Sequence, residues 1–316
     1  MNETGIEWAD KTWSPTRGCS RVSPGCEHCY AERIAARFSG DTDERLWKSR
    51  GIPFTTHAPF GGFARSTPPR WTGRVELIES KLTEPLHRRR SAEKFLREHG
   101  RKPLVFVDSM SDLLHEKLSD KAIHRAFAVM AESVWFDFVV LTKRVERLLA
   151  ICQARPPGWV LPHVRLGVSV EDRQRADERL PHLMKVEAMG WVFDWKTVVS
   201  FEPLLSAIEL TAEQWRAIGW AIIGGESGPG ARPCELVWIR SLRDQAKAAA
   251  VPCFVKQLGS HIVVDGASDK LSQWRDDVRV CGSCDHGIGK YGVRLTHPRG
   301  ADIQEWPMDL RVQEYP

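Results

Sequence analysis

The fold is decided by residues 103–144, which read PLVFVDSMSDLLHEKLSDKAIHRAFAVMAESVWFDFVVLTKR. This stretch begins with a short apolar run rich in β-branched residues, 103–109. Apolar residues at helical spacing follow, with Ser119 placed to cap that helix, and a second apolar run occupies 135–144. The order strand, helix, strand predicts a βαβ unit with two parallel strands.

The same alternation continues along the chain. Further short apolar runs occupy 163–172, 196–205, 219–228 and 251–259, and most are followed by a stretch with helical spacing. A series of βα units is typical of α/β proteins with a parallel sheet. We expect a first strand around Ile6–Trp8, ahead of this series.

We expect three segments in the chain. A barrel-like domain should span 1–259, with a basic, irregular insertion of about 38–103, and a C-terminal extension should occupy 260–316. Residues 61–103 hold 11 Lys and Arg against five Glu, a net +6 within a chain of net +4. Such a concentration suits a phosphate backbone, and Trp71 lies within it. The alternative is a solvated helix face.

Each predicted strand ends in polar residues or glycine. In parallel sheets and barrels the C-terminal strand ends form the active face, so these ends predict one shared site. Alternatively, each is an ordinary loop start that caps the next helix. Lys143, Arg144, Lys256 and Gln257 could hold an anionic substrate, or could form structural ion pairs with the strand-end carboxylates. The other candidates at these ends are Asp108, Ser109, Ser169, Glu171, Glu202, Gly224, Gly225 and Glu226.

Composition narrows the class of protein. The chain has 316 residues, 42% hydrophobic and 27% charged, without an apolar run of about 18 residues. We therefore expect no membrane helix. The start MNETGIEWADK lacks the basic and apolar regions of a secretory signal, so we expect a cytoplasmic protein with reduced thiols. Eight cysteines scattered over this length are not typical of a disulfide framework, so we expect none.

Three of those cysteines cluster in SPTRGCSRVSPGCEHCYAE, residues 14–32. Structural zinc usually takes four protein ligands, and Cys19, Cys26 and Cys29 supply three. A four-iron cluster held by three thiolates keeps one iron open for a small molecule. The residues beside the last cysteine, His28 and Tyr30, carry flat rings that could pack against a bound nucleoside. A structural zinc site and unrelated thiols are the alternatives.

The motif Cys-x6-Cys-x2-Cys ahead of a βα series resembles the radical S-adenosylmethionine (radical SAM) superfamily, whose usual gaps are three and two. More closely, the cysteine stretch looks like a phage-associated three-Cys-motif family of uncharacterised radical-SAM-like proteins. That resemblance covers roughly residues 5 to 259. It continues in the motifs VFVDSMSDLLHE, LTKR, LGVSVED, SFEPLL, GGESGPGARP and FVKQLG.

The resemblance implies a partial (β/α)6-type TIM barrel of radical SAM type, a [4Fe-4S] cluster and bound S-adenosylmethionine. Cys19, Cys26 and Cys29 would ligate three irons. Cleavage of S-adenosylmethionine would give a 5′-deoxyadenosyl radical that abstracts hydrogen from a substrate. The superfamily's Gly-Gly-Glu belongs on the second strand, where this chain has Asp108 and Ser109, and its own GGESG lies at 224–228.

The resemblance also implies partners and further site residues. Ser169 and Glu171 would meet the ribose or the amino group, and Glu202 could do the same from the next strand. An electron donor such as flavodoxin or ferredoxin would be required. The substrate we expect is nucleic acid, in repair of DNA lesions, photolesions included, or in nucleotide modification.

A second hypothesis is a non-catalytic nucleic-acid-binding protein whose three cysteines hold structural zinc. Colour separates the two, since a cluster is brown and zinc is colourless. In the tail, Cys281 and Cys284 could form a zinc site with His286 and His297 or hold a second cluster, or could be reduced thiols.

Overall fold

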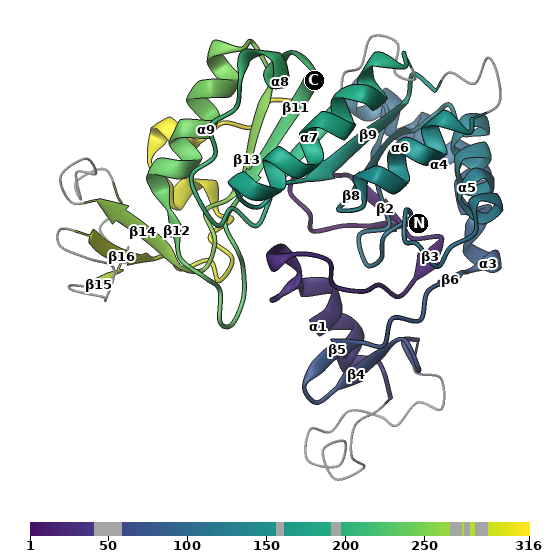
Figure 1. Ribbon diagram of the computed structural model, residues 1–316, viewed down its shortest axis with the longest axis horizontal. Helices are drawn as coiled ribbons and strands as arrows, with labels where there is room; N and C mark the ends of the chain where they lie inside the picture. Colours follow the sequence, from purple (N-terminus) through teal and green to yellow (C-terminus); the bar gives the residue numbers. More distant parts are fainter. Residues whose placement is uncertain (41–58, 156–160, 191–196, 266–273, 275–278, 282–289) are drawn as a thin grey trace. The chain divides into compact units, whose positions relative to one another are not determined.

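The computed structural model forms two compact units (Figure 1). Unit 1 comprises Met1–Gly5 and Ala9–Arg147, and unit 2 comprises Ile6–Trp8 and Leu148–Pro316. The residues that the structure describes are 1–40, 59–155, 161–190, 197–265, 274, 279–281 and 290–316. Cys284 and His286 lie outside them.

Unit 1 is built on three parallel strands. β2 (Lys11–Trp13) pairs with β7 (Leu104–Val107), and β7 pairs with β8 (Asp137–Thr142). β1 (Asn2–Glu3) adds an antiparallel strand beside β2. Most side chains of β7 and β8 are buried. Continuous apolar runs such as these are typical of parallel strands covered on both faces.

Helices connect the strands of unit 1. α1 (Tyr30–Arg37) follows the cysteine stretch, and α5 (Asp120–Glu132) joins β7 to β8. The Ser119 hydroxyl accepts a hydrogen bond from the backbone N–H of Ala122 at 3.2 Å, which confirms the predicted N-cap. α6 (Val145–Gln153) begins in unit 1 and continues into the residues of unit 2.

The insertion between α1 and β7 is more regular than predicted where the structure describes it. It contains the antiparallel pair β4 (Ala64–Ser66) and β5 (Pro69–Trp71), and its strand β6 (Glu76–Leu77) pairs antiparallel with β3 (Thr16–Arg17), which precedes α1. β4 and β5 both contact α1. Helical segments then lead to β7: α3 (Glu79–Leu82), η2 (Glu84–His87) and α4 (Arg89–His99).

Unit 2 contains four parallel strands in the order β9, β10, β11, β13. Their bounds are Val164–Ser169, Thr197–Phe201, Ile218–Gly224 and Cys253–Gln257, and nearly every side chain in them is buried. The helices of this unit are α7 (Arg173–Ala188), α8 (Ala212–Arg216) and α9 (Leu236–Ala248). α9 contacts both β11 and β13.

A second, mixed sheet completes unit 2, in the order β12, β14, β16, β15 (Figure 1). These strands are Cys234–Glu235, Ile262–Asp265, Lys290–Arg294 and Arg279–Cys281. Two short 3-10 helices follow, η4 (Ile303–Glu305) and η5 (Met308–Leu310). The last residues then pair with β13, where the backbone N–H of Val255 donates to the carbonyl of Val312 at 2.8 Å.

The α/β class is confirmed, and the parallel strands of each unit are compatible with a partial barrel. All six apolar runs from 103–109 to 251–259 contain a strand. The strand predicted around Ile6–Trp8 was wrong: Ile6–Trp8 forms no strand, and the first parallel strand lies at Lys11–Trp13. The Trp8 ring instead packs edge-on against the Trp220 ring within unit 2, with 5.7 Å between the ring centroids. Trp8 is therefore apolar because it packs against another side chain, and not because it belongs to a strand.

In the described part of the chain, no helix is both long enough and apolar enough to cross a membrane.

Candidate functional site

The three cysteines lie in unit 1, in the loop from β3 to α1. A 3-10 turn, η1 (Pro24–Cys26), carries Cys26, and its backbone N–H donates to the carbonyl of Ser23 at 2.9 Å. Cys29 occupies the N-cap position of α1. The turn and the helix start therefore fix two of the three cysteine backbones.

Gly18 fixes the backbone ahead of Cys19. Its φ is +90°, and a Cβ at this position would lie 1.9 Å from the backbone oxygen of Arg74 and 2.9 Å from the Phe63 ring. Only glycine combines this conformation with so close an approach. The carbonyl of Gly18 also accepts a hydrogen bond from the Ser111 hydroxyl at 2.7 Å, so the loop is attached to the segment after β7.

Two of the thiols are in apolar surroundings. Cys19 and Cys29 pack against a buried cluster of Ala31, Ala35, Ala64 and Trp71. Burial raises the pKa of Cys19 to about 12, and nearby Asp112 adds to that rise while Arg144 opposes it. Burial also raises the pKa of Cys29, against backbone N–H groups at the start of α1 and the charge of Lys143. Both thiols are therefore protonated unless a cation binds them.

Within the described residues, no three His, Cys, Asp or Glu side chains are close enough together to hold a single metal ion. The thiolates of a four-iron cluster bind separate irons, so they need not converge on one point. The donor chemistry suits such a cluster, because the other cysteines of the loop help to raise the pKa of Cys19, and Cys26 helps to raise that of Cys29.

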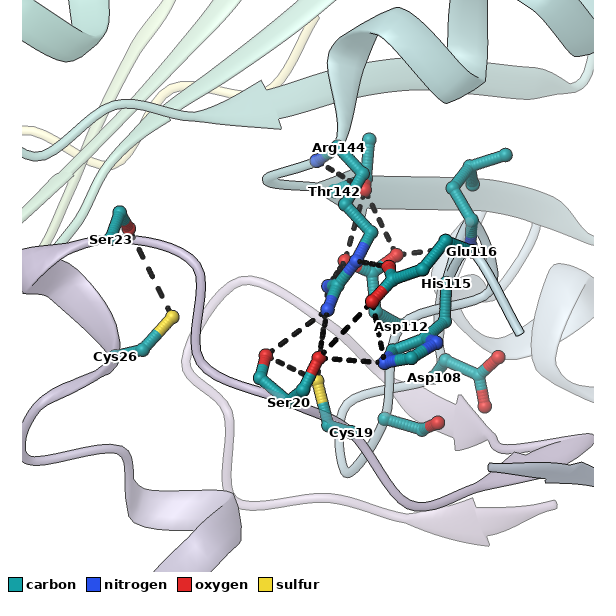
Figure 2. A network of polar contacts seen from close by, with 12 residues as sticks. Cys19, Ser20, Ser23, Cys26, Asp108, Asp112, His115, Glu116, Thr142 and Arg144 are labelled. Carbon is teal, nitrogen blue, oxygen red and sulfur yellow. Dashed lines mark hydrogen bonds and ion pairs between the residues drawn. The ribbon is translucent and has the colours of Figure 1, made fainter. Parts of the chain in front are cut away.

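A polar network lies beside Cys19, and Arg144 is at its centre (Figure 2). The guanidinium donates from Nε to Glu116 Oε2 at 2.6 Å and from Nη1 to Asp112 Oδ2 at 2.8 Å. Its Nη2 donates to the Ser20 carbonyl at 3.1 Å and to Ser20 Oγ at 2.8 Å. The Arg144 side chain is only 8% exposed and that of Asp112 9%, whereas the Glu116 carboxylate is open to solvent.

His115 and Thr142 complete this network. The His115 Nδ1 accepts a hydrogen bond from the backbone N–H of Lys117, and its Nε2 lies 2.8 Å from Ser20 Oγ. Burial lowers the pKa of His115, so we assign a neutral ring that donates from Nε2 to Ser20. The Thr142 hydroxyl at the end of β8 donates to Asp112 Oδ1 at 2.9 Å.

Asp108, at the end of β7, anchors the start of the cysteine loop. It accepts hydrogen bonds from the backbone N–H of Thr16 at 3.2 Å and from the Thr16 hydroxyl at 2.8 Å. Burial raises the pKa of Asp108 to about 7 despite these bonds. Its φ is +57°, a conformation that Asp adopts more readily than most side chains.

The two flat rings of the cysteine loop differ in their surroundings. The Tyr30 hydroxyl donates to the backbone carbonyl of Ser109, and the residue is 40% exposed. His28 is half-buried. Contact of either ring with a nucleoside stays a prediction.

Unit 2 brings together a separate group of predicted residues. Lys256 Nζ and Gln257 Nε2 both donate to Glu202 Oε1, at 2.6 and 3.0 Å. Gly224 lies directly beside them, because a Cβ there would be 3.3 Å from Gln257 Cγ and 3.4 Å from Glu202. A Cβ on Gly225 would meet the Leu258 carbonyl at 2.2 Å, so this position admits no side chain.

The remaining predicted carboxylates of unit 2 have arginine partners. Glu171 is fully buried and pairs with Arg179 at 2.8 Å, and the same Arg179 donates to the Ser169 carbonyl at 2.6 Å. Glu226 pairs with Arg232 at 2.6 Å. These pairs hold the carboxylates in place, and their predicted contacts with a cofactor stay predictions.

The basic insertion is less uniformly positive than its composition suggests. Carboxylate partners neutralise part of it: Arg74 pairs with Glu76, Arg89 with Glu93, Lys94 with Glu98 and Arg101 with Asp10. Arg65 and Arg70 are different, because they are exposed and directly opposite each other on β4 and β5. Trp71, which the sequence offered as part of a nucleic-acid surface, is only 8% exposed and packs in the core.

Sequence reasoning missed the residues that connect the cysteine loop to the strand ends. These are Thr16, Ser20, Asp112, His115 and Glu116. One signal was available: Asp112, His115 and Glu116 lie shortly after the end of a predicted strand, in the quoted motif VFVDSMSDLLHE. The contact of Ser20 with Arg144 joins residues 124 apart and has no local signal.

The fold and the site together define an α/β protein with a half-buried three-cysteine loop. Residues 3–294 match the family described as "Protein of unknown function (DUF5131)", and the chain belongs to this family. The match gives no support for an association with phage. A search of curated proteins found no match.

Two solved structures are similar to this chain at 12% identity. One is a mutant of spore photoproduct lyase with bound AdoMet and dinucleoside spore photoproduct, with a TM-score of 0.39 over 90% of this chain and 69% of that chain. The other is spore photoproduct lyase complexed with dinucleoside spore photoproduct, with a TM-score of 0.33 over 89% of this chain and 67% of that chain. At these scores the likeness is too distant to assign a function.

Proposed function

We propose that this protein is an iron–sulfur radical SAM enzyme. Cys19, Cys26 and Cys29 would hold a [4Fe-4S] cluster, and S-adenosylmethionine would bind the open iron. The observation that carries the proposal is the cysteine loop itself. It combines three thiols in 11 residues with a glycine-fixed entry and a polar network made by the segments that follow two parallel strands.

When bound, these groups supply one-electron chemistry: reductive cleavage of S-adenosylmethionine and removal of a hydrogen atom from the substrate. The chain's own residues bind, orient and exclude water. The packing of Cys19 and Cys29 against Ala31, Ala35 and Trp71 would keep water away from the sulfur ligands. An external donor such as flavodoxin or ferredoxin would supply the electron.

The cofactor and substrate contacts belong to this proposal. We assign His28, Tyr30, Asp108, Ser109, Ser169, Glu171, Glu202, Gly224, Gly225 and Glu226 to the cofactor. We assign Lys143, Lys256 and Gln257 to an anionic substrate. Gln257 would accept a hydrogen bond from an N–H or O–H group of that substrate and not contact its negative charge, because its Oε1 is buried without a hydrogen-bond partner among the described residues while its Nε2 is fully engaged. A ligand donor would satisfy this oxygen.

Nucleic acid is the substrate class that we propose, and DNA-lesion repair or nucleotide modification is the reaction class. The support is the exposed pair Arg65 and Arg70 on the β4–β5 hairpin. Two guanidinium groups on one face repel each other unless an anion lies between them. A phosphodiester backbone would supply that anion, and β4 and β5 contact α1, the helix that begins next to Cys29.

The test is anaerobic reconstitution with iron and sulfide, reduction with dithionite, and an assay for 5′-deoxyadenosine after addition of S-adenosylmethionine. We expect product from the wild type and none from Cys26→Ala. Cys152→Ala is the matched control, since Cys152 is a buried thiol in unit 2 and should leave product formation unchanged. A colourless protein that holds one zinc and makes no 5′-deoxyadenosine would overturn the proposal in favour of structural zinc.

A further inference from the structure

Arg144 has no N–H group left for a substrate. A guanidinium carries five N–H donors. In this protein one Nε–H is directed at Glu116, two Nη1 donors at Asp112 and at Cys19 Sγ (3.9 Å), and two Nη2 donors at the carbonyl and hydroxyl of Ser20. Every donor therefore has an acceptor within unit 1.

These contacts connect two segments that are far apart in the sequence. Ser20 is the residue after Cys19, whereas Asp112 and Glu116 belong to the segment after β7. Asp112 is itself fixed by the Thr142 hydroxyl and by the backbone N–H of Leu114 at 3.0 Å. Arg144 therefore holds the backbone beside Cys19 against a rigid carboxylate, with the planar fork geometry that lysine lacks.

The same position gives Arg144 an electrostatic effect on the sulfur of Cys19. A guanidinium within 4 Å of a thiolate stabilises negative charge there, and the 8% exposure of its side chain limits screening by water. Nearby charge and hydrogen bonds to the sulfur ligands are among the factors that set the reduction potential of an iron–sulfur cluster. Addition of one electron makes the cluster more negative, so a nearby cation favours the reduced form.

We propose that Arg144 is a positioning residue of the cysteine loop: it orders the backbone around Cys19, raises the reduction potential of the cluster bound there, and does not contact substrate. This inference rests on the proposed iron–sulfur function. It replaces the substrate-binding role that the position of Arg144 at a strand end predicts.

The first experiment uses the metal-free full-length protein, so it is independent of the cluster. Hydrogen exchange at residues 19–22 should be about tenfold faster in Arg144→Gln than in the wild type, because a network of partly buried charge-assisted hydrogen bonds is lost. Arg144→Lys should also exchange faster, since one ammonium group cannot reach all five acceptors. Arg147→Gln is the control, because Arg147 pairs with Asp120 and does not contact the cysteine loop.

The second experiment measures the midpoint potential of the reconstituted proteins by dithionite titration with redox mediators. We expect Arg144→Gln to shift the one-electron reduction equilibrium about tenfold toward the oxidised form, or ~59 mV. Arg144→Lys keeps the positive charge and should shift the midpoint potential less. The affinity of an anionic oligonucleotide for the metal-free protein should be the same in all three.

The outcomes separate this inference from the proposed function. If the wild type binds no cluster, the proposed function fails. The wild type could bind a cluster while Arg144→Gln has the same hydrogen-exchange rate and the same midpoint potential as the wild type. The proposed role of Arg144 would then be overturned, while the proposed function would stand. Lower oligonucleotide affinity with an unchanged potential would restore the substrate-binding role. Should Arg144→Gln fail to fold, Ser20→Ala removes one acceptor of the network and should give a smaller change in the same direction.

Discussion

At the scale of single residues, Asp108 makes the stability of the fold depend on pH. Burial raises its pKa from the ordinary 3.8 to about 7, so the folded protein holds this proton more tightly than the unfolded chain does. The contribution of Asp108 to stability is therefore greatest below pH 4. It falls as the pH rises toward 7 and is constant above that.

Asp108→Asn should remove this dependence while keeping the size of the side chain and its tolerance of a positive φ. Relative to the wild type, the variant should gain roughly 4 kcal/mol at most in free energy of unfolding between pH 4 and pH 8. Urea unfolding of both proteins across that range measures the difference. If the difference in free energy of unfolding between the two proteins stays constant with pH, the pKa of Asp108 is not raised by folding.

Gly18 controls the path of the chain into the cysteine loop. Gly18→Ala would force a Cβ against the Arg74 carbonyl, so the cysteine loop or the connection between β5 and β6 that holds Arg74 must move. We expect a loss of about 3 kcal/mol or more in free energy of unfolding, together with reduced iron uptake. Gly100→Ala is the matched control, since Gly100 also has a positive φ but open space around it, and should cost only about 1 kcal/mol. Equal losses in the two variants would contradict a steric role for Gly18.

At the scale of secondary-structure elements, the β4–β5 hairpin carries the proposed nucleic-acid contact. Arg65→Gln combined with Arg70→Gln should lower the slope of log K against log salt by roughly 1.4 to 1.8 for a single-stranded or duplex oligonucleotide. Arg89→Gln should leave the slope nearly unchanged, because Arg89 is already paired with Glu93 on α4. Fluorescence anisotropy at several salt concentrations provides the measurement. An identical slope in the double variant would exclude this hairpin from the interface.

The elements also show what could be predicted from sequence. Continuous apolar runs gave the six strands β7 to β11 and β13, because buried parallel strands need them on both faces. The first parallel strand, β2, was missed, since Lys11 and Thr12 are polar and their place in the sheet depends on pairing with β7. The cysteine loop was visible from spacing alone. The attachment of this loop through Ser20, Asp112 and Arg144 could not be predicted from the sequence, because it arises only from tertiary contacts.

At the scale of the whole molecule, residues 312–315 cover the edge strand of the unit 2 sheet. β13 is the last strand of that sheet, and the final residues cover it: the backbone N–H of Glu314 donates to the Cys253 carbonyl at 2.9 Å. The Trp220 indole donates to the Glu314 carbonyl at 2.9 Å. The Tyr315 ring packs against Phe254 at 5.3 Å. An uncovered strand of this kind would offer unpaired backbone groups to a second chain.

Deletion of residues 312–316 should therefore destabilise the protein and promote its self-association. The loss of the hydrogen bonds that Val312 and Glu314 make with β13 and Trp220, together with the Tyr315 contact, should cost about 4 kcal/mol or more in free energy of unfolding. Thermal unfolding and size-exclusion chromatography at several concentrations measure the two effects. Removal of Pro316 alone is the control, since this exposed residue lies beyond the paired segment and should change neither. A truncated protein that stays monomeric with an unchanged melting temperature would show that the tail does not protect β13.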